Sequence, residues 1–350
     1  MKKFIHFFIL IVLLFSSVYC ADNYAFAIDG EIIQYDVYDE NGNLLTFTSE
    51  AEVGDTILTK DFDEYQIYEI DGNKCYARYF RTLNWPKPDN SNEGKSANLS
   101  KKICLYMTHN DESYTPTDGY DSIYGAGGIH DVAKKIKDTF EKNGIEVVLD
   151  ETLHIPHNSS AYSRSAVTAK SLYESENPDA LFDIHRDGVS KSYYYTTNEG
   201  EPFSKVRIVV GKSNPNFEEN YKFAQEVFAM GNQLYPWLFL DIYCGKGHYN
   251  QELMNTNLLF EMGTYLIEKE YVLNSVPYLV DAIQNTMYAS VYDPEKELIP
   301  EEEFIESQTP SSQEESNTSS ATSVVVVGLL LGGLLIFAFV STIKRKKFTK

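Results

Sequence analysis

The chain has 350 residues, of which 30 are lysine or arginine and 51 are aspartate or glutamate, so its formal net charge is −21. Hydrophobic residues make up 43% of the chain, enough to fill the core of one large domain or two smaller ones, which excludes wholesale disorder. The negative charge excludes a nucleic-acid partner, because neutralising phosphates requires a basic face.

The N-terminal segment is typical of a secretory signal. Lys2 and Lys3 precede an apolar run, and small residues at Ala25 and Ala27 form a cleavage-site pattern. We therefore predict a signal peptide at residues 1–27. An uncleaved N-terminal membrane anchor is the alternative.

Residues 28–84 alternate short apolar and polar stretches. Asn41 and Asp71 are each followed by glycine, and both dipeptides are typical of hairpin turns. The pattern predicts a small β-rich module with strands at 31–37, 44–48, 56–58, 65–70 and 75–80. A polar, proline-containing linker at 85–100 follows it.

Residues 101–295 change to alternating strands and helices. Short apolar stretches predict strands at 103–108, 145–149, 180–184, 206–210, 239–243 and 258–260. Helical spacing of apolar residues predicts helices at 129–143, 162–175, 217–234 and 271–287. The alternation predicts an α/β fold with a mixed, mostly parallel sheet flanked by helices.

The C-terminal end is typical of a membrane anchor. Residues 296–322 are rich in serine, threonine and glutamate and predict a flexible stalk. Residues 323–343 carry no charge and are long enough for a transmembrane helix, and the basic tail at 344–350 is expected in the cytoplasm. These segments predict a single-pass protein of the cell membrane whose large domain is extracytoplasmic.

Four candidate site residues follow predicted strands. His109 and Glu112 come after the first strand, His185 after the third and Glu261 after the last. In α/β sheets the carboxyl ends of the strands form the ligand site. Two imidazoles and a carboxylate with an open fourth position suit catalytic Zn²⁺, and a further carboxylate can transfer protons. Either Glu112 or Glu261 can be the ligand, with the other as the base; His154 and His157 form a weaker alternative ligand pair.

Several spaced motifs occur in the order found in one protein family. They are the stretch at 105–114 with its Thr-His and Glu-Ser-Tyr, Tyr-Ser-Arg-Ser at 162–165, Asp-Ile-His-Arg-Asp at 183–187, the stretch at 210–216, Tyr-Asn-Gln at 249–251 and Leu-Phe-Glu-Met-Gly at 259–263. Over roughly residues 101–290 the chain resembles the stage II sporulation protein P family.

The resemblance implies a zinc-dependent peptidoglycan hydrolase whose fold is similar to N-acetylmuramoyl-L-alanine amidases. It implies cleavage of the amide between N-acetylmuramic acid and L-Ala, with endopeptidase activity also ascribed to the family. The implied site has zinc ligands His109, Glu112 and His185, the catalytic carboxylate Glu261, and substrate-binding residues Arg164, Arg186 and Asn250. A structural ion pair is the alternative role for either arginine. The implied partners are a lytic transglycosylase and a membrane scaffold protein of sporulation engulfment.

The chain departs from the family pattern in two places. Met107 stands where the family usually has a further histidine, and the predicted anchor is C-terminal where family members usually have an N-terminal one. A role in vegetative wall remodelling is therefore as open as one in sporulation. Two other functions compete with the amidase: a non-catalytic peptidoglycan-binding module and a zinc carboxypeptidase-like peptidase.

Overall fold

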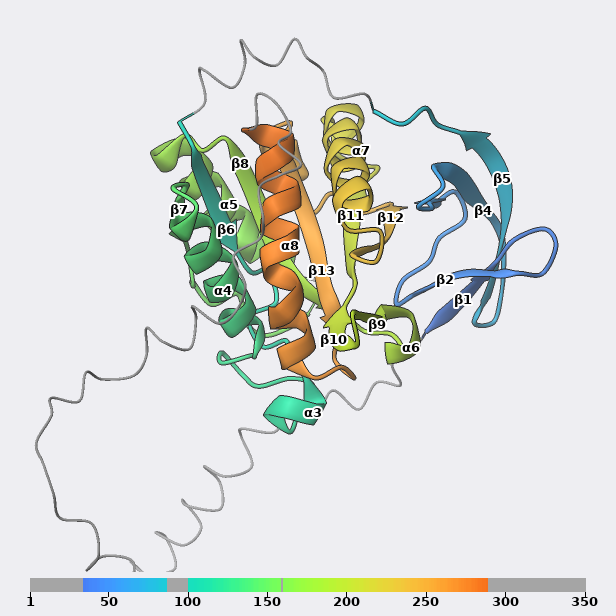
Figure 1. Cartoon of the computed structure of the whole chain (residues 1–350), viewed down its shortest axis with the longest axis horizontal. Helices are drawn as coiled ribbons and strands as arrows, with labels where there is room; N and C mark the ends of the chain where they lie inside the picture. The colour runs from blue at the N-terminus through green and yellow to red at the C-terminus, as the bar shows by residue number, and fades with distance from the viewer. Residues whose placement is uncertain (1–33, 87–99, 159, 289–350) are drawn as a thin grey trace, which may run out of the picture. The chain divides into compact units, whose positions relative to one another are not determined.

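A mixed sheet of eleven strands forms the centre of the computed structural model, which describes residues 34–86, 100–158 and 160–288 (Figure 1). The strand order is β2-β1-β5-β4-β3-β12-β11-β13-β8-β6-β7. The strands are β1 Tyr35–Tyr38, β2 Leu44–Thr48, β3 Thr56–Leu58, β4 Asp63–Asp71, β5 Lys74–Thr82, β6 Lys102–Tyr106, β7 Glu146–Leu149, β8 Ala180–Asp187, β11 Val206–Gly211, β12 Phe239–Gly245 and β13 Asn257–Thr264. A separate hairpin pairs β9 (Tyr195–Asn198) with β10 (Glu201–Ser204).

Helices cover both faces of this sheet. The helices are α3 Thr115–Asp118, α4 Ile129–Lys142, α5 Ala161–Glu176, α6 Lys191–Tyr194, α7 Phe217–Leu234 and α8 Lys269–Met287, with a 3₁₀ turn at Gln251–Leu253. Figure 1 shows α4, α8 and α7 side by side across one face, with α5 behind the sheet. The mixed α/β fold is thus confirmed. From β12 to β7 the sheet is mostly parallel, with β11 and β13 the antiparallel pair.

Alternation along the strands assigns side chains to the two faces. Ile103 and Leu105 of β6 lie in the large core under α4 and α8, whereas Cys104 and Tyr106 pack against Ala169 of α5. The same rule holds in β8, where Ile184 lies in the large core. Its neighbours Asp183 and His185 therefore point to the α5 face, where the candidate site lies.

The predicted β-rich segment continues the main sheet. β3 pairs antiparallel with β12, so β1 to β5 extend the sheet at one edge. A second small core beneath these strands includes Val37, Ile57 and Ile67 and also takes in Tyr243 from β12. Residues 34–86 therefore share both hydrogen bonds and apolar contacts with the α/β part.

Two predicted strands extend further than expected. β8 continues through His185 to Asp187, and β13 continues through Glu261 to Thr264. The two strands pair in parallel, so each supplies backbone partners to the other beyond its apolar residues. His185 and Glu261 are therefore directly opposite each other inside the sheet, and not in the loops after it.

The predicted transmembrane helix is corrected. Among the helices of residues 34–86, 100–158 and 160–288, none is both long and apolar enough to cross a membrane. The segment at 323–343, on which that prediction rested, lies outside the described residues, as do the signal at 1–27, the stalk at 296–322, the tail at 344–350 and most of the linker.

Candidate metal centre

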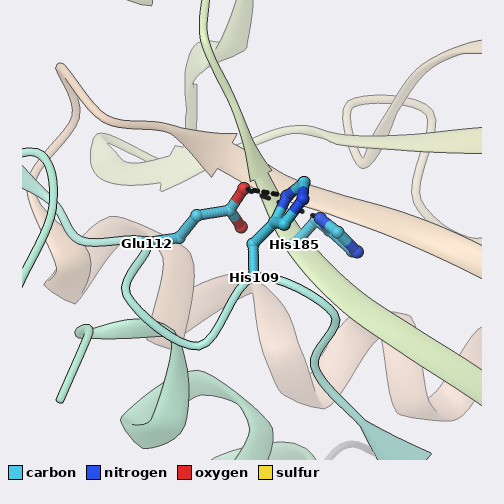
Figure 2. A group of neighbouring side chains, drawn as sticks. All are labelled: His109, Glu112 and His185. Atoms are coloured by element: carbon cyan, nitrogen blue, oxygen red, sulfur yellow. Dashed lines mark hydrogen bonds and ion pairs between the residues drawn. The ribbon is translucent and has the colours of Figure 1, made fainter. Parts of the chain in front are cut away.

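Three of the predicted ligands meet at one point on the α5 face. Figure 2 shows His109, Glu112 and His185 turned toward one another, with one oxygen of Glu112 facing both imidazoles. Oε1 of Glu112 lies 3.1 Å from Nδ1 of His109 and 3.6 Å from Nδ1 of His185. The three donor atoms all lie within 4.8 Å of one another.

These separations fit a zinc ion. Tetrahedral Zn²⁺ with bonds of about 2.0–2.1 Å holds its ligand atoms about 3.3 Å apart. This is close to the separations of 3.1 and 3.6 Å between Glu112 and the two imidazoles. The other oxygen of Glu112 accepts a hydrogen bond from the backbone N–H of Arg186 at 2.9 Å. Glu112 is therefore oriented with Oε1 toward the imidazoles, and the geometry favours Glu112 over Glu261 as the carboxylate ligand.

Charge at the centre also favours a cation. Burial would raise the pKa of Glu112, but the charge of His185 and the contacts of both imidazoles hold that pKa well below its usual range. Burial would lower the pKa of His185, but the carboxylates of Asp183 and Glu112 raise it well above its usual range. The carboxylates of Glu112 and Asp183 therefore favour a positive charge at this point, which either the protonated imidazole of His185 or a divalent metal ion can supply.

Asp183 orients His185 from the side away from Glu112. Its Oδ1 lies 3.0 Å from Nε2 of His185, although the two are not aligned as a hydrogen bond. Asp183 is in turn held by Thr108, whose N–H and hydroxyl donate to it at 2.8 and 2.6 Å. A carboxylate behind a metal-binding imidazole fixes the tautomer and raises the basicity of the ligand nitrogen.

We expect Asp183→Asn to weaken zinc binding by about 10- to 100-fold, because the neutral amide removes the charge behind His185. Competition with a calibrated chelator measures the change. Asp138→Asn, an exposed carboxylate on α4, is the matched control and should leave zinc affinity unchanged. Equal affinity in the two variants would contradict a role for Asp183.

Glu261 lies beside the three candidate ligands but outside their group. It is directly opposite His185 on the neighbouring strand, and its Oε2 is inaccessible to solvent, without a hydrogen-bond partner among the described residues. Burial, and then the negative charge of Asp187, raises the pKa of Glu261 well above its usual range. A carboxylate with a raised pKa is a stronger base and can transfer protons in general acid–base catalysis.

The other predicted residues make contacts within the fold. Arg164 donates to the carbonyl of His154 at 2.9 Å and also to that of Pro156, so it holds the loop before α5. Arg186 donates to the carbonyls of Ser113 and Asp121 at 3.2 and 2.9 Å. Buried Asn250 donates to Ser165 at 3.0 Å. Their predicted contacts with substrate stay predictions.

Sequence reasoning missed a buried cluster of charges beside Glu261. Arg207 lies opposite Glu261 on β11 and donates to Asp187 at 2.9 Å and to Asp241 at 2.7 Å. It also donates to the carbonyl of Phe47 and so links the N-terminal strands to the site. No local sequence pattern indicates Arg207. Asp183 could have been predicted as a neighbour of His185, because it lies two residues earlier in the same strand and so shares its face of the sheet.

Two tyrosine rings lie beside the candidate metal centre. The ring of Tyr162, from α5, lies 5.5 Å from that of His109 and 6.2 Å from that of His185. Tyr249 packs edge-on against Tyr162 at 5.5 Å.

Met107, at the position of the usual family histidine, is buried, and its carbonyl contacts Nδ1 of His154 at 2.7 Å. His154 therefore makes contacts within the fold, whereas His157, the other member of the alternative ligand pair, stacks on the candidate ligand His109.

Comparison with known proteins places the chain in a family. The sequence profile described as Stage II sporulation protein P (SpoIIP) matches residues 48–284. The chain belongs to the stage II sporulation protein P family. The stage II sporulation protein P of Bacillus subtilis (strain 168) is 31% identical over 181 residues, which cover 47% of this chain and 45% of that protein. The match thus spans less than half the length of this relative.

Solved structures of three amidases are similar at low identity. An N-acetylmuramoyl-L-alanine amidase of Nostoc punctiforme is 15% identical with a TM-score of 0.34, covering 54% of this chain and 97% of that one. One from Clostridium difficile 630 is 15% identical with a TM-score of 0.36, covering 53% and 93%. The catalytic domain of one from Bacillus (Paenibacillus) polymyxa is 14% identical with a TM-score of 0.34, covering 53% and 96%.

Proposed function

We propose that the chain is a zinc-dependent peptidoglycan hydrolase that cleaves the amide between N-acetylmuramic acid and L-Ala. The observation that carries the proposal is the group of His109, Glu112 and His185 with Glu261 directly opposite His185. Membership of the stage II sporulation protein P family supports peptidoglycan as the substrate. Because that substrate lies outside the cytoplasm, we place the domain there, and a role in sporulation is part of the proposal.

Each residue has a task in this reaction. When bound, Zn²⁺ supplies a Lewis acid that polarises the scissile carbonyl and lowers the pKa of water. His109, Glu112 and His185 hold the ion, and Asp183 keeps His185 in the metal-binding tautomer. Glu261 accepts the proton from the attacking water and delivers it to the leaving amine, a task for which a raised pKa suits it.

Metal removal tests the proposal. Purified sacculi are incubated with the protein, with the protein treated with chelator, and with the treated protein after zinc is restored. We expect release of free stem peptides beginning with L-Ala, loss of that release after chelation, and recovery with zinc. Mass analysis of the products identifies the cleaved bond. Release that survives complete zinc removal contradicts the mechanism, and products cut within the stem peptide indicate an endopeptidase.

A further inference from the structure

His157 lies beside the metal centre without belonging to the group of ligands. Its ring stacks on the ring of His109, with the centroids 3.8 Å apart and the planes inclined by 21°. Its side chain is 25% exposed, so part of the imidazole is accessible to solvent beside the site. A side chain in this position can contact a substrate whose cleaved bond lies over His109.

Asp111 determines which nitrogen of His157 is available. Its Oδ1 lies 3.0 Å from Nδ1 of His157, while its Oδ2 accepts a hydrogen bond from Ser122 at 2.8 Å. A buried carboxylate in this position favours the tautomer with a proton on Nδ1. This tautomer presents the lone pair of Nε2, for which no residue in the described part of the chain supplies a hydrogen bond.

The loop that carries His157 is held in place by contacts with Arg164 of α5 and with Asn110. Arg164 binds the carbonyls of His154 and Pro156, as described above. The backbone N–H of His154 donates to Asn110 at 2.6 Å, which ties the loop to the segment that carries His109. His157 is therefore positioned before substrate arrives, and preorganised groups bind with a smaller entropic cost.

We propose that Nε2 of His157 accepts a hydrogen bond from a peptide N–H of the substrate beside the cleaved bond. The inference rests on the proposed function and names the group that binds the peptide arm. A nitrogen lone pair selects an N–H donor, and the peptide arm carries N–H groups next to the amide that is cut. The stacking contact of 3.8 Å places the imidazole of His157 directly beside that of the candidate ligand His109.

The test measures binding and zinc content separately. The probe is N-acetylmuramoyl-L-alanyl-D-isoglutamine, titrated calorimetrically into the full chain carrying Glu261→Gln, so that the probe stays uncut. His157→Phe in this background keeps a stacked ring and removes the acceptor, and His157→Gln offers an amide oxygen in its place. The control is His130→Gln. His130 also pairs with a carboxylate, that of Glu151, and makes none of the ring contacts described for His109.

We expect His157→Phe to weaken binding about tenfold, the effect of losing one hydrogen bond, with zinc content unchanged. His157→Gln should recover part of the affinity, and His130→Gln should bind as the parent does. Unchanged affinity in His157→Phe, absence of any probe binding by the parent, or loss of zinc from His157→Phe would each overturn the inference. If the native protein leaves sacculi uncut while His157→Phe still weakens binding, the proposed function fails and the contact stands.

Discussion

Glu261→Gln is expected to lower the rate of peptidoglycan cleavage by about 10²- to 10⁴-fold, because an amide cannot carry the proton from water to the leaving amine. The substitution keeps the size of a side chain whose Oε2 is buried and has no partner in the described part of the chain. Since Glu261 lies outside the group of ligands, the variant should bind zinc as the native protein does. Initial rates on purified sacculi, measured beside zinc content, check both expectations.

The matched control is Glu112→Gln, which changes the other glutamate of the site by the same atoms. Because Oε1 of Glu112 faces both imidazoles, we expect that variant to lose zinc as well as activity. If Glu261→Gln loses zinc while Glu112→Gln retains it, the roles of the two carboxylates are exchanged. Full activity in Glu261→Gln would remove Glu261 from the reaction altogether.

Arg207→Met is expected to lower the free energy of unfolding by about 3–5 kcal/mol, because it leaves buried carboxylates without their cation. Both partners of Arg207, Asp187 and Asp241, are almost inaccessible to solvent. The guanidinium also binds the hydroxyl of Thr46 at 2.6 Å, so the variant loses a tie between the N-terminal strands and the main sheet. Urea unfolding monitored by circular dichroism measures the loss.

Lys134→Met provides the comparison for Arg207→Met. Lys134 pairs with Asp138 on the surface of α4 at 2.8 Å, with both side chains at least half exposed. Exposed pairs contribute at most about 1 kcal/mol, so this variant should unfold close to the native protein. Equal unfolding midpoints for the two variants would show that the Arg207 cluster adds no more to stability than a surface pair does.

Local periodicity was sufficient to predict most of the α/β part. The apolar spacing that begins at Ile129 predicted α4, and the apolar stretches beginning at Ile103 and Ala180 predicted β6 and β8. These predictions succeeded because burial of one face depends on spacing along the chain. The ends of β8 and β13 were missed because polar residues such as His185 gave no apolar signal, although neighbouring strands supply their hydrogen bonds.

The candidate ligands could be predicted because His109, Glu112 and His185 follow or end predicted strands, and parallel strands end at the same edge of a sheet. The contacts behind them could not be predicted in the same way. Thr46 and Asp241, which share a hydrogen bond of 2.6 Å, are 195 residues apart in the chain. Nothing in the spacing around either residue indicates that β12 joins β3 and brings them together.

By itself, the sequence determined the alternation of strands and helices, the identity of the candidate ligands and the family. These depend on residue type and spacing along the chain, which local physics and motif order can interpret. Only the tertiary structure decided that Glu112 faces both imidazoles, that Arg207 lies opposite Glu261 and that His157 stacks on His109. Such contacts depend on the order of strands and the course of loops, which are set by the packing of the whole sheet.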